Sequence, residues 1–351
     1  MSDCGWRPWQ PVAGLPGITA AVLGEILDGG QAFRWYPVGD VWVGTFGSLI
    51  AALRVSAGGG VEWSAPFGSA ADAVAPFTPV APASAGTSDR GSAIARYLRA
   101  DEPDPADALP WRSDAHLSRC MTAFPGLRIL RQPFGETLLC FLCSATKQIV
   151  QIKQMVALLA QRHGAPIAGP AVLDLGPLLT AAGGSARAET ASAAALLPAA
   201  PAVASLRYRL PTWDELAGVP ERLLRDCLLG FRARYIAQTA QFLQQHPGWL
   251  EETEQLPYAQ AKARLCDLPG VGEKVADCAL LFGAGKGEAF PVDVWILKTL
   301  ARRYQLEGWK PAQLAQFGRA HFGPHAGLAQ QFLFSWERAE GKNGKGERLK
   351  G

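Results

Sequence analysis

Residues 265–281 read LCDLPGVGEKVADCALL, and this stretch decides the fold of the second part of the chain. Residues 258–266 are compatible with a helix, and the apolar run 275–281 indicates another. The LPGVG segment between them is therefore predicted to be a tight turn joining two helices. The start of the second helix exposes unpaired backbone N–H groups, which can bind a phosphate without any cationic side chain. The pentapeptide alone fits an ordinary turn between two core helices equally well.

Lys274 lies in the first turn of this second helix, four residues before Cys278. Residues at this spacing share a helix face, so Lys274 lies along a partly apolar surface where desolvation favours the neutral amine. A neutral amine is a nucleophile that can form a Schiff base with the aldehyde carbon of a sugar. The alternative is a solvated lysine that pairs with Glu273 or Asp277. Cys278 fits a small apolar pocket residue better than a nucleophile, because no activating histidine is near it.

Asp293 is the second candidate for chemistry, in the stretch PVDVWILKTL. It precedes an apolar helix, which is the position of a helix N-cap. A capping carboxylate can also face a neighbouring pocket and stabilise positive charge that develops on a sugar. The sequence leaves both interpretations open: Asp293 only caps the helix, or it caps the helix and takes part in the reaction.

The composition is that of a globular protein, with 48% hydrophobic and 19% charged residues, and 351 residues suggest about two domains. The net charge of +3 permits an anionic partner without requiring one. Seven scattered cysteines do not form a secreted disulfide framework, so a reducing compartment is expected. No run is long and apolar enough to span a bilayer, and we expect no membrane partner.

The hydrophobic pattern predicts an α+β protein with an N-terminal antiparallel β-sheet domain over residues 1–120 and a helical domain over residues 121–340. Residues 65–91, rich in Ala, Pro, Ser and Gly, are predicted to form a loop. Residues 164–205 have a similar composition and are interpreted as a low-complexity insertion, most of which need not pack. The basic, glycine-rich residues 341–351 are predicted to form a flexible tail.

A lysine after LPGVG together with an aspartate in PVDV resembles the helix-hairpin-helix DNA glycosylases with the Gly/Pro–Asp loop. More narrowly, the chain is similar to the 8-oxoguanine DNA glycosylase/lyases over most of its length. The resemblance implies a sheet domain followed by an all-α helix-hairpin-helix glycosylase domain. It also implies excision of 8-oxoguanine from damaged double-stranded DNA, with Lys274 as nucleophile and Asp293 stabilising the cationic sugar. No cofactor and no metal are implied. We expect a monomer, cytoplasmic and nucleoid-associated in a bacterium or nuclear in a eukaryote.

The same resemblance assigns a pocket for the damaged base. The segment GGQAFRW places on Gly30 the carbonyl that reads the oxidised base, and Cys278 would line the pocket. The segment GLAQQFLFSWE implies that Gln330 bonds the base edge and that Phe334 stacks on its face. These two residues are four apart, so an amide and a ring can converge on one planar ligand. Simple core packing is the alternative for Phe334.

Other residues are assigned to the DNA around the lesion. The segment GFRARY implies a wedge at Phe231 and a reader of the orphaned cytosine at Arg232. The family usually has an asparagine run and a further arginine after its C-S pair, where this chain has Thr146 and Gln151. Trp295 stands where the family often has a histidine that contacts phosphate. The phosphate contacts of the hairpin fall on Gly270, Val271 and Gly272.

Two other functions fit parts of this pattern. An alkylated-base DNA glycosylase shares the fold but usually works without the lysine, so Lys274 argues against it. A non-catalytic helix-hairpin-helix DNA-binding protein would have no use for a Lys274/Asp293 pair or for a pocket of Gln330 and Phe334.

Overall fold

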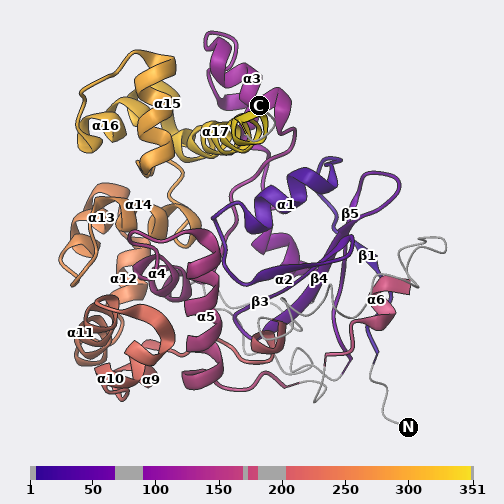
Figure 1. Cartoon of the computed structure of the whole chain (residues 1–351), viewed down its shortest axis with the longest axis vertical. Helices are drawn as coiled ribbons and strands as arrows, with labels where there is room; N and C mark the ends of the chain where they lie inside the picture. The colour runs from indigo at the N-terminus through magenta and orange to yellow at the C-terminus, as the bar shows by residue number, and fades with distance from the viewer. Residues whose placement is uncertain (1–4, 68–89, 169–172, 181–202, 349–351) are drawn as a thin grey trace.

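The computed structural model describes residues 5–67, 90–168, 173–180 and 203–348. Its N-terminal part contains one antiparallel sheet with the strand order β1-β5-β4-β3-β2. The strands are β1 (Gln10–Pro11), β2 (Trp35–Val38), β3 (Val41–Phe46), β4 (Leu49–Val55) and β5 (Val61–Ser64). Figure 1 shows this sheet beside a larger group of helices formed by the rest of the chain.

The inner face of the sheet packs on helix α1 (Ala20–Asp28) and on the helical part of the molecule. Trp35 of β2 is fully buried and pairs in register with Gly44 of β3. A Cβ atom at Gly44 would lie 2.2 Å from the Trp35 ring, so only glycine leaves room for the indole. The Trp35 indole donates a 2.8 Å hydrogen bond to the hydroxyl of Tyr97, which satisfies its buried polar atom.

The outer face of the sheet is covered by the two ends of the predicted insertion. Leu178 in α6 (Gly176–Thr180) and Leu206 in the short helix η3 (Ser205–Arg207) are buried against Tyr36 of the sheet. These flanks therefore pack, because they cover apolar surface that would otherwise face water. Residues 181–202 of the insertion, and residues 68–89 of the predicted loop, lie outside the described residues.

Helices form the rest of the described chain, and the fold class predicted from the sequence is confirmed. In the first half they are α2 (Arg90–Tyr97), η2 (Pro105–Ala108), α3 (Ala115–Ala123), α4 (Phe134–Leu142) and α5 (Ile149–His163). They continue with α9 (Trp213–Ala217), α10 (Glu221–Leu224), η4 (Arg225–Leu229), α11 (Arg232–Gln245), α12 (Trp249–Gln255) and α13 (Tyr258–Cys266). The last are α14 (Glu273–Phe282), α15 (Val294–Tyr304), α16 (Pro311–Phe322), η5 (Gly323–His325) and α17 (Ala326–Arg348).

Helix α17 continues to Arg348 and so extends into residues 341–351, for which a flexible tail stays a prediction. Packing supports its extension at Gly341, where an added Cβ would lie 3.0 Å from the ring of Trp295. The described helices include none long and apolar enough to cross a lipid bilayer.

A continuous hydrophobic core joins the sheet to the helices. Phe141 of α4 lies at its centre, with its ring centroid 5.4 Å from that of Phe33 and 5.5 Å from that of Phe282. Phe33 precedes the sheet strand β2, whereas Phe282 ends α14. Because one ring contacts both parts, the end of α14 is held in a fixed position relative to the segment that leads into β2.

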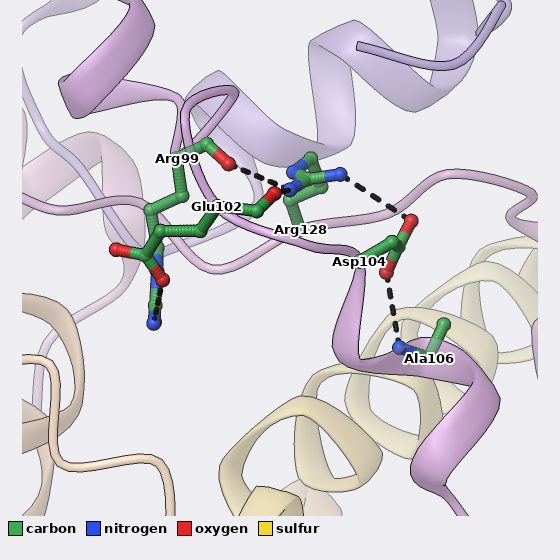
Figure 2. A network of polar contacts seen from close by, with 5 residues as sticks. All are labelled: Arg99, Glu102, Asp104, Ala106 and Arg128. Atoms are coloured by element: carbon green, nitrogen blue, oxygen red, sulfur yellow. Dashed lines mark hydrogen bonds and ion pairs between the residues drawn. The ribbon is translucent and has the colours of Figure 1, made fainter. Parts of the chain in front are cut away.

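A buried arginine fixes the segment that leads from α3 to α4. Figure 2 shows the Arg128 guanidinium donating hydrogen bonds to the carbonyls of Arg99 and Glu102 and to the Asp104 carboxylate, at 2.6, 3.3 and 3.3 Å. The carbonyl of Arg128 accepts a 2.9 Å hydrogen bond from the Gln31 amide. The network therefore also anchors the loop that precedes β2.

Candidate active site

The predicted pair of helices joined by a tight turn is present, with α13 ending at Cys266 and α14 beginning at Glu273. Gly270 has φ +77°, and a Cβ there would lie 2.5 Å from the ring of Tyr235, so glycine is required by both conformation and space. Gly272 is the N-cap of α14 and is exposed, and a Cβ there would have no neighbour within 4 Å. The turn thus presents backbone N–H groups of α14 to solvent, as a phosphate site requires.

Lys274 follows this turn and is directed into the protein. Its Nζ donates a 3.3 Å hydrogen bond to Ser144 Oγ and lies 5.1 Å from the ring centroid of Phe141. Lys274 does not form the solvated ion pair that was the alternative interpretation, because Glu273 and Asp277 are both paired with Lys262. Lys262 Nζ lies 3.2 Å from Glu273 and 3.0 Å from Asp277. The amine of Lys274 is therefore held in a partly buried position beside α4.

Cys278 lies one turn further along α14 and is buried. Burial raises the pKa of its thiol to about 12, against which the nearby charge of Lys274 acts only in part. At neutral pH the side chain is an uncharged thiol, which is a poor nucleophile. This agrees with the interpretation of Cys278 as an apolar pocket residue.

Asp293 caps α15, as its sequence position predicts. Its Oδ1 accepts hydrogen bonds from the backbone N–H groups of Trp295 and Ile296, at 3.0 and 2.9 Å. Burial raises the pKa of this carboxyl, whereas the two N–H groups and the positive charge of Lys274 act in the opposite direction. The cap thus fixes the Asp293 carboxylate within the electrostatic influence of the Lys274 amine. Only Oδ1 accepts the capping hydrogen bonds, so Oδ2 takes no part in the cap. Capping and a role in chemistry are compatible in this geometry.

The structure brings together Gly30 and Phe334, which are far apart in the sequence. Gly30 has φ +108°, and a Cβ there would lie 3.3 Å from Ile149 Cδ1 and 3.8 Å from the Phe334 ring. Gln330 lies one turn before Phe334 on α17 and is buried, with its Oε1 accepting a 2.8 Å hydrogen bond from Gln331. Gly30 and Phe334 therefore meet at the start of α5, with Ile149 as a third neighbour.

Two sets of hydrogen bonds hold the backbone at Gly30. On one side, Gln31 is buried, accepts a 2.9 Å bond from the N–H of Leu130 and, through its carbonyl, a 2.7 Å bond from Gln132. On the other side, Arg338 of α17 donates a 2.5 Å bond to the carbonyl of Gly29. The glycine carbonyl assigned to base reading is thus part of a rigid loop.

Arg338 also defines the outer side of the pocket. Its guanidinium lies 5.4 Å from the ring centroid of Phe334 and forms a 3.1 Å ion pair with Glu25 of α1. Ser335 donates a 2.9 Å bond to the same carboxylate. The ring of Phe334 is therefore held between Gly30 and a paired arginine, which restricts its rotation.

The residues assigned to the opposite strand form hydrogen bonds within the protein, and their contacts with DNA stay a prediction. Arg232 is buried and donates hydrogen bonds to the carbonyl of Ala145 and to Thr146 Oγ1, the second at 3.0 Å. Thr146 has φ +56° and is exposed. Gln151 accepts a 3.2 Å bond from the N–H of Gln148 and so caps α5. The structure thus places Thr146 against Arg232 and leaves Gln151 apart from them.

Two aromatic residues of the predicted set lie at helix starts. Phe231 is the N-cap residue of α11, and 52% of its surface is exposed. Its ring lies 4.4 Å from the guanidinium of Arg232. Trp295 lies in the first turn of α15, where its indole packs on Gly341 of α17 and has Lys298 Nζ 5.2 Å from its ring.

The segment from Phe141 to Ile149 contacts three of the predicted site residues. Phe141 and Ser144 contact Lys274, Thr146 contacts Arg232, and Ile149 faces Gly30. Sequence reasoning did not assign Phe141, Ser144, Ile149 or Arg338 to the site. Arg338 had a local signal, since it lies four residues after Phe334 on the same helix. The others are recognised only once the segment between α4 and α5 is placed against α14. Among the described residues, no three His, Cys, Asp or Glu side chains gather as metal ligands would.

Comparison with known proteins agrees with this geometry, although no protein-family model matches the chain. A probable N-glycosylase/DNA lyase of Methanothermobacter thermautotrophicus is 37% identical over 118 residues, which are 34% of this chain and 38% of the relative. The N-glycosylase/DNA lyase OGG1 of Arabidopsis thaliana is 29% identical over 323 residues, covering 87% of this chain and 74% of the relative. The chain thus spans well under half of the first relative and about three quarters of the second.

A solved structure is similar over nearly the whole chain. It is the 8-oxoguanine glycosylase/lyase of Clostridium acetobutylicum in complex with double-stranded DNA that contains cytosine opposite 8-oxoguanine. The TM-score is 0.69 with 25% identity, and the match covers 91% of this chain and 92% of that one. In its fold, its hairpin and its partly buried lysine, this chain is similar to the helix-hairpin-helix DNA glycosylases. Within that superfamily it is similar to the 8-oxoguanine DNA glycosylase/lyases, which confirms the resemblance seen in the sequence.

Proposed function

We propose that the chain is a bifunctional DNA glycosylase/AP lyase that excises 8-oxoguanine from duplex DNA and then cleaves the strand by β-elimination. The observation that carries this proposal is the position of Lys274. Its amine is partly buried, hydrogen-bonded to Ser144, and close to the carboxylate of Asp293. A surface lysine that served only to bind phosphate would gain nothing from this placement.

The reaction follows from these two groups. The neutral amine of Lys274 forms a bond to the anomeric carbon of the extruded nucleotide, and the glycosidic bond breaks with its electron pair leaving on the base, which takes up a proton. Asp293 stabilises the positive charge on the sugar during this step. The sugar ring then opens to a Schiff base. A C2′ proton then passes to water, the C2′–H electron pair forms the C2′=C3′ bond, and the C3′–O bond breaks. The phosphate leaves as the 5′-phosphate of the strand on the 3′ side.

The base is removed from the duplex stack before this chemistry, since Lys274 reaches no atom inside a stacked helix. Gly30 and Phe334 form the walls of the pocket that would receive it. Gln330 is buried beside them and carries the amide suited to a base edge. The backbone of the α13–α14 turn supplies phosphate contacts that do not depend on sequence. We propose that one protein molecule acts alone on damaged double-stranded DNA.

Borohydride trapping tests the proposal. Duplexes with one 8-oxoguanine, one alkylated purine or no lesion are incubated with protein and borohydride, and the covalent complex is measured. We expect the complex with 8-oxoguanine only, and its loss together with strand cleavage in Lys274→Gln. Lys310→Gln removes an exposed lysine and serves as the matched control. Trapping by Lys274→Gln would disprove the nucleophile, and equal trapping on the alkylated duplex would favour the alkylated-base alternative.

A further inference from the structure

Leu228 has two unusual properties for a leucine. Its side chain is 59% exposed, and its backbone has φ +63°, in the left-handed region that branched side chains disfavour. Its neighbours Cys227 and Leu229 are both fully buried. Burial of the two neighbours forces Leu228 outward, and neither hydrophobic burial in the protein nor backbone preference explains a leucine there. Strained residues of this kind cluster at functional sites.

The loop that carries Leu228 is held firmly at both ends. Arg162 of α5 donates a 2.6 Å hydrogen bond to the carbonyl of Asp226. Arg232 donates a 3.2 Å bond to the carbonyl of Leu229. The exposed leucine is therefore presented by a fixed backbone, and its exposure is a property of the folded loop.

The same arginine places this loop beside the predicted opposite-strand residues. Arg232 bonds Leu229 with one nitrogen and Thr146 with the other, so Leu228 is one residue from this junction. Phe231, the predicted wedge, follows three residues later and is also largely exposed. Between them, a Cβ at Gly230 would meet no atom within 4 Å, so the protein leaves the space around this part of the loop open.

We propose that Leu228 and Phe231 form a two-pronged apolar wedge that enters duplex DNA at adjacent positions. Phe231 takes the space next to the extruded lesion, and Leu228 enters a neighbouring base step. Apolar side chains such as Phe and Leu are suited to this role, because they unstack a base step and kink the duplex. The wedge rests on the proposed function, since it acts on the duplex from which the base is extruded. It adds a contact that widens the opening beyond the lesion pair.

Fluorescence and excision test this wedge separately. Two duplexes carry an uncleavable abasic analogue, with 2-aminopurine at the base step on one side or the other, and its fluorescence rises when the step unstacks. Two further duplexes carry 8-oxoguanine, either with a paired neighbouring step or with that step already opened by a mismatch. The variants are Leu228→Gly, which accepts positive φ, and Trp309→Ala, which removes another exposed apolar side chain.

Leu228→Gly should melt at the same or a higher temperature than the wild type, because the strained leucine is gone. It should lose the fluorescence rise at one step and slow single-turnover excision from the paired duplex by about tenfold, as expected for losing one buried leucine. Excision from the pre-opened duplex should stay within about twofold. Trp309→Ala should match the wild type throughout.

Two measurements decide whether the wedge exists. They are the fluorescence at the neighbouring step in the wild-type complex and the excision rate of Leu228→Gly on the paired duplex. No fluorescence rise with the wild type, or no loss in the variant, overturns the wedge. An equal loss on the pre-opened duplex also overturns it, since the residue would then act through the fold. A wild-type protein that unstacks the abasic duplex without excising 8-oxoguanine would refute the proposed chemistry and still support the wedge.

Discussion

Lys274 Nζ donates a hydrogen bond to Ser144 Oγ at 3.3 Å, and the same serine donates its only hydroxyl proton to the carbonyl of Phe141 at 2.7 Å. Because that proton is committed, the serine oxygen can only accept from the amine. One N–H of Lys274 is thereby fixed toward α4. In the neutral amine the lone pair then points away from Ser144.

Ser144→Ala should therefore slow formation of the trapped complex without weakening DNA binding. Loss of a hydrogen bond of this kind is worth about 0.5–1.5 kcal/mol, so we expect a decrease of about two- to tenfold in the single-turnover rate. The measurement is borohydride trapping at saturating protein, beside the affinity for an uncleavable abasic duplex. Ser113→Ala, which removes a surface hydroxyl bonded to Pro110, is the control. An unchanged trapping rate would show that the serine does not position the amine.

The raised pKa of Asp293 predicts a dependence of excision on pH. Burial is the main cause, so this carboxyl takes up its proton at a higher pH than an ordinary aspartate. The protonated acid cannot stabilise a cationic sugar. Excision should fall as pH decreases through the raised pKa, and the loss should begin above the range of a solvent-exposed aspartate. Asp293→Asn keeps the cap and should lower the rate sharply at all pH values.

Single-turnover rates from pH 4 to 8 distinguish the two roles of Asp293. In Asp293→Asn the part of the acid-side decrease that belongs to this carboxyl should disappear. The melting temperature should stay close to that of the wild type. If the variant excises the base at a normal rate, Asp293 only caps α15.

The two glycines of the hairpin should respond to substitution in opposite ways. Gly272→Ala meets open space at φ −94°, so the fold should tolerate it, whereas a bound phosphate would lie against the new methyl group. Gly270→Ala combines positive φ with a clash against Tyr235 and should destabilise the fold by about 1–2 kcal/mol or more. Thermal unfolding and binding to undamaged duplex measure both effects. A binding loss by Gly272→Ala confined to lesion-containing DNA would contradict the phosphate role.

Local signals in the sequence predicted the hairpin, the lysine and the capping aspartate. Each depends on residues within one or two turns, where glycine conformation and cap chemistry act directly. Contacts between distant segments had no such signal. The placement of Gly30 against Phe334 depends on how α1 and the residues after it contact α17. Ser144 reaches Lys274 only because α4 packs on α14.

Other differences also have physical reasons. The sequence did not predict a left-handed backbone at Leu228, because leucine rarely adopts this conformation. The burial of Cys227 and Leu229 on either side imposes it. The assignment of Gln151 to DNA stays a prediction, and the structure adds that its spacing of three from Gln148 forms a capping pair. Gly341 of α17 lies against the ring of Trp295, a contact between distant segments that helix propensity does not predict.

The last prediction concerns the base opposite the lesion. In the resembled family an asparagine and two arginines contact the orphaned cytosine, whereas this chain has Thr146 and Gln151 at two of those positions. Arg232, the remaining member, is buried and already bonded to Ala145 and Thr146, so it must exchange these bonds before it can contact a base. Gln151 is engaged in capping α5. A good bidentate contact discriminates between bases by about 1–3 kcal/mol, so fewer contacts should relax the choice of partner.

We therefore expect excision of 8-oxoguanine opposite cytosine, with activity opposite the other three bases less suppressed than the family pattern implies. Single-turnover excision with each of the four opposite bases measures this preference. The double variant Thr146→Asn with Gln151→Arg should sharpen it toward cytosine. Asparagine also tolerates the positive φ at position 146 better than threonine, so the variant should not lose stability there. A sharp cytosine preference in the wild type would mean that other exposed residues near Thr146, such as Lys147 or Gln148, read the base. In that case the relaxed preference would be wrong, and the roles of Lys274 and Asp293 would stand on their own tests.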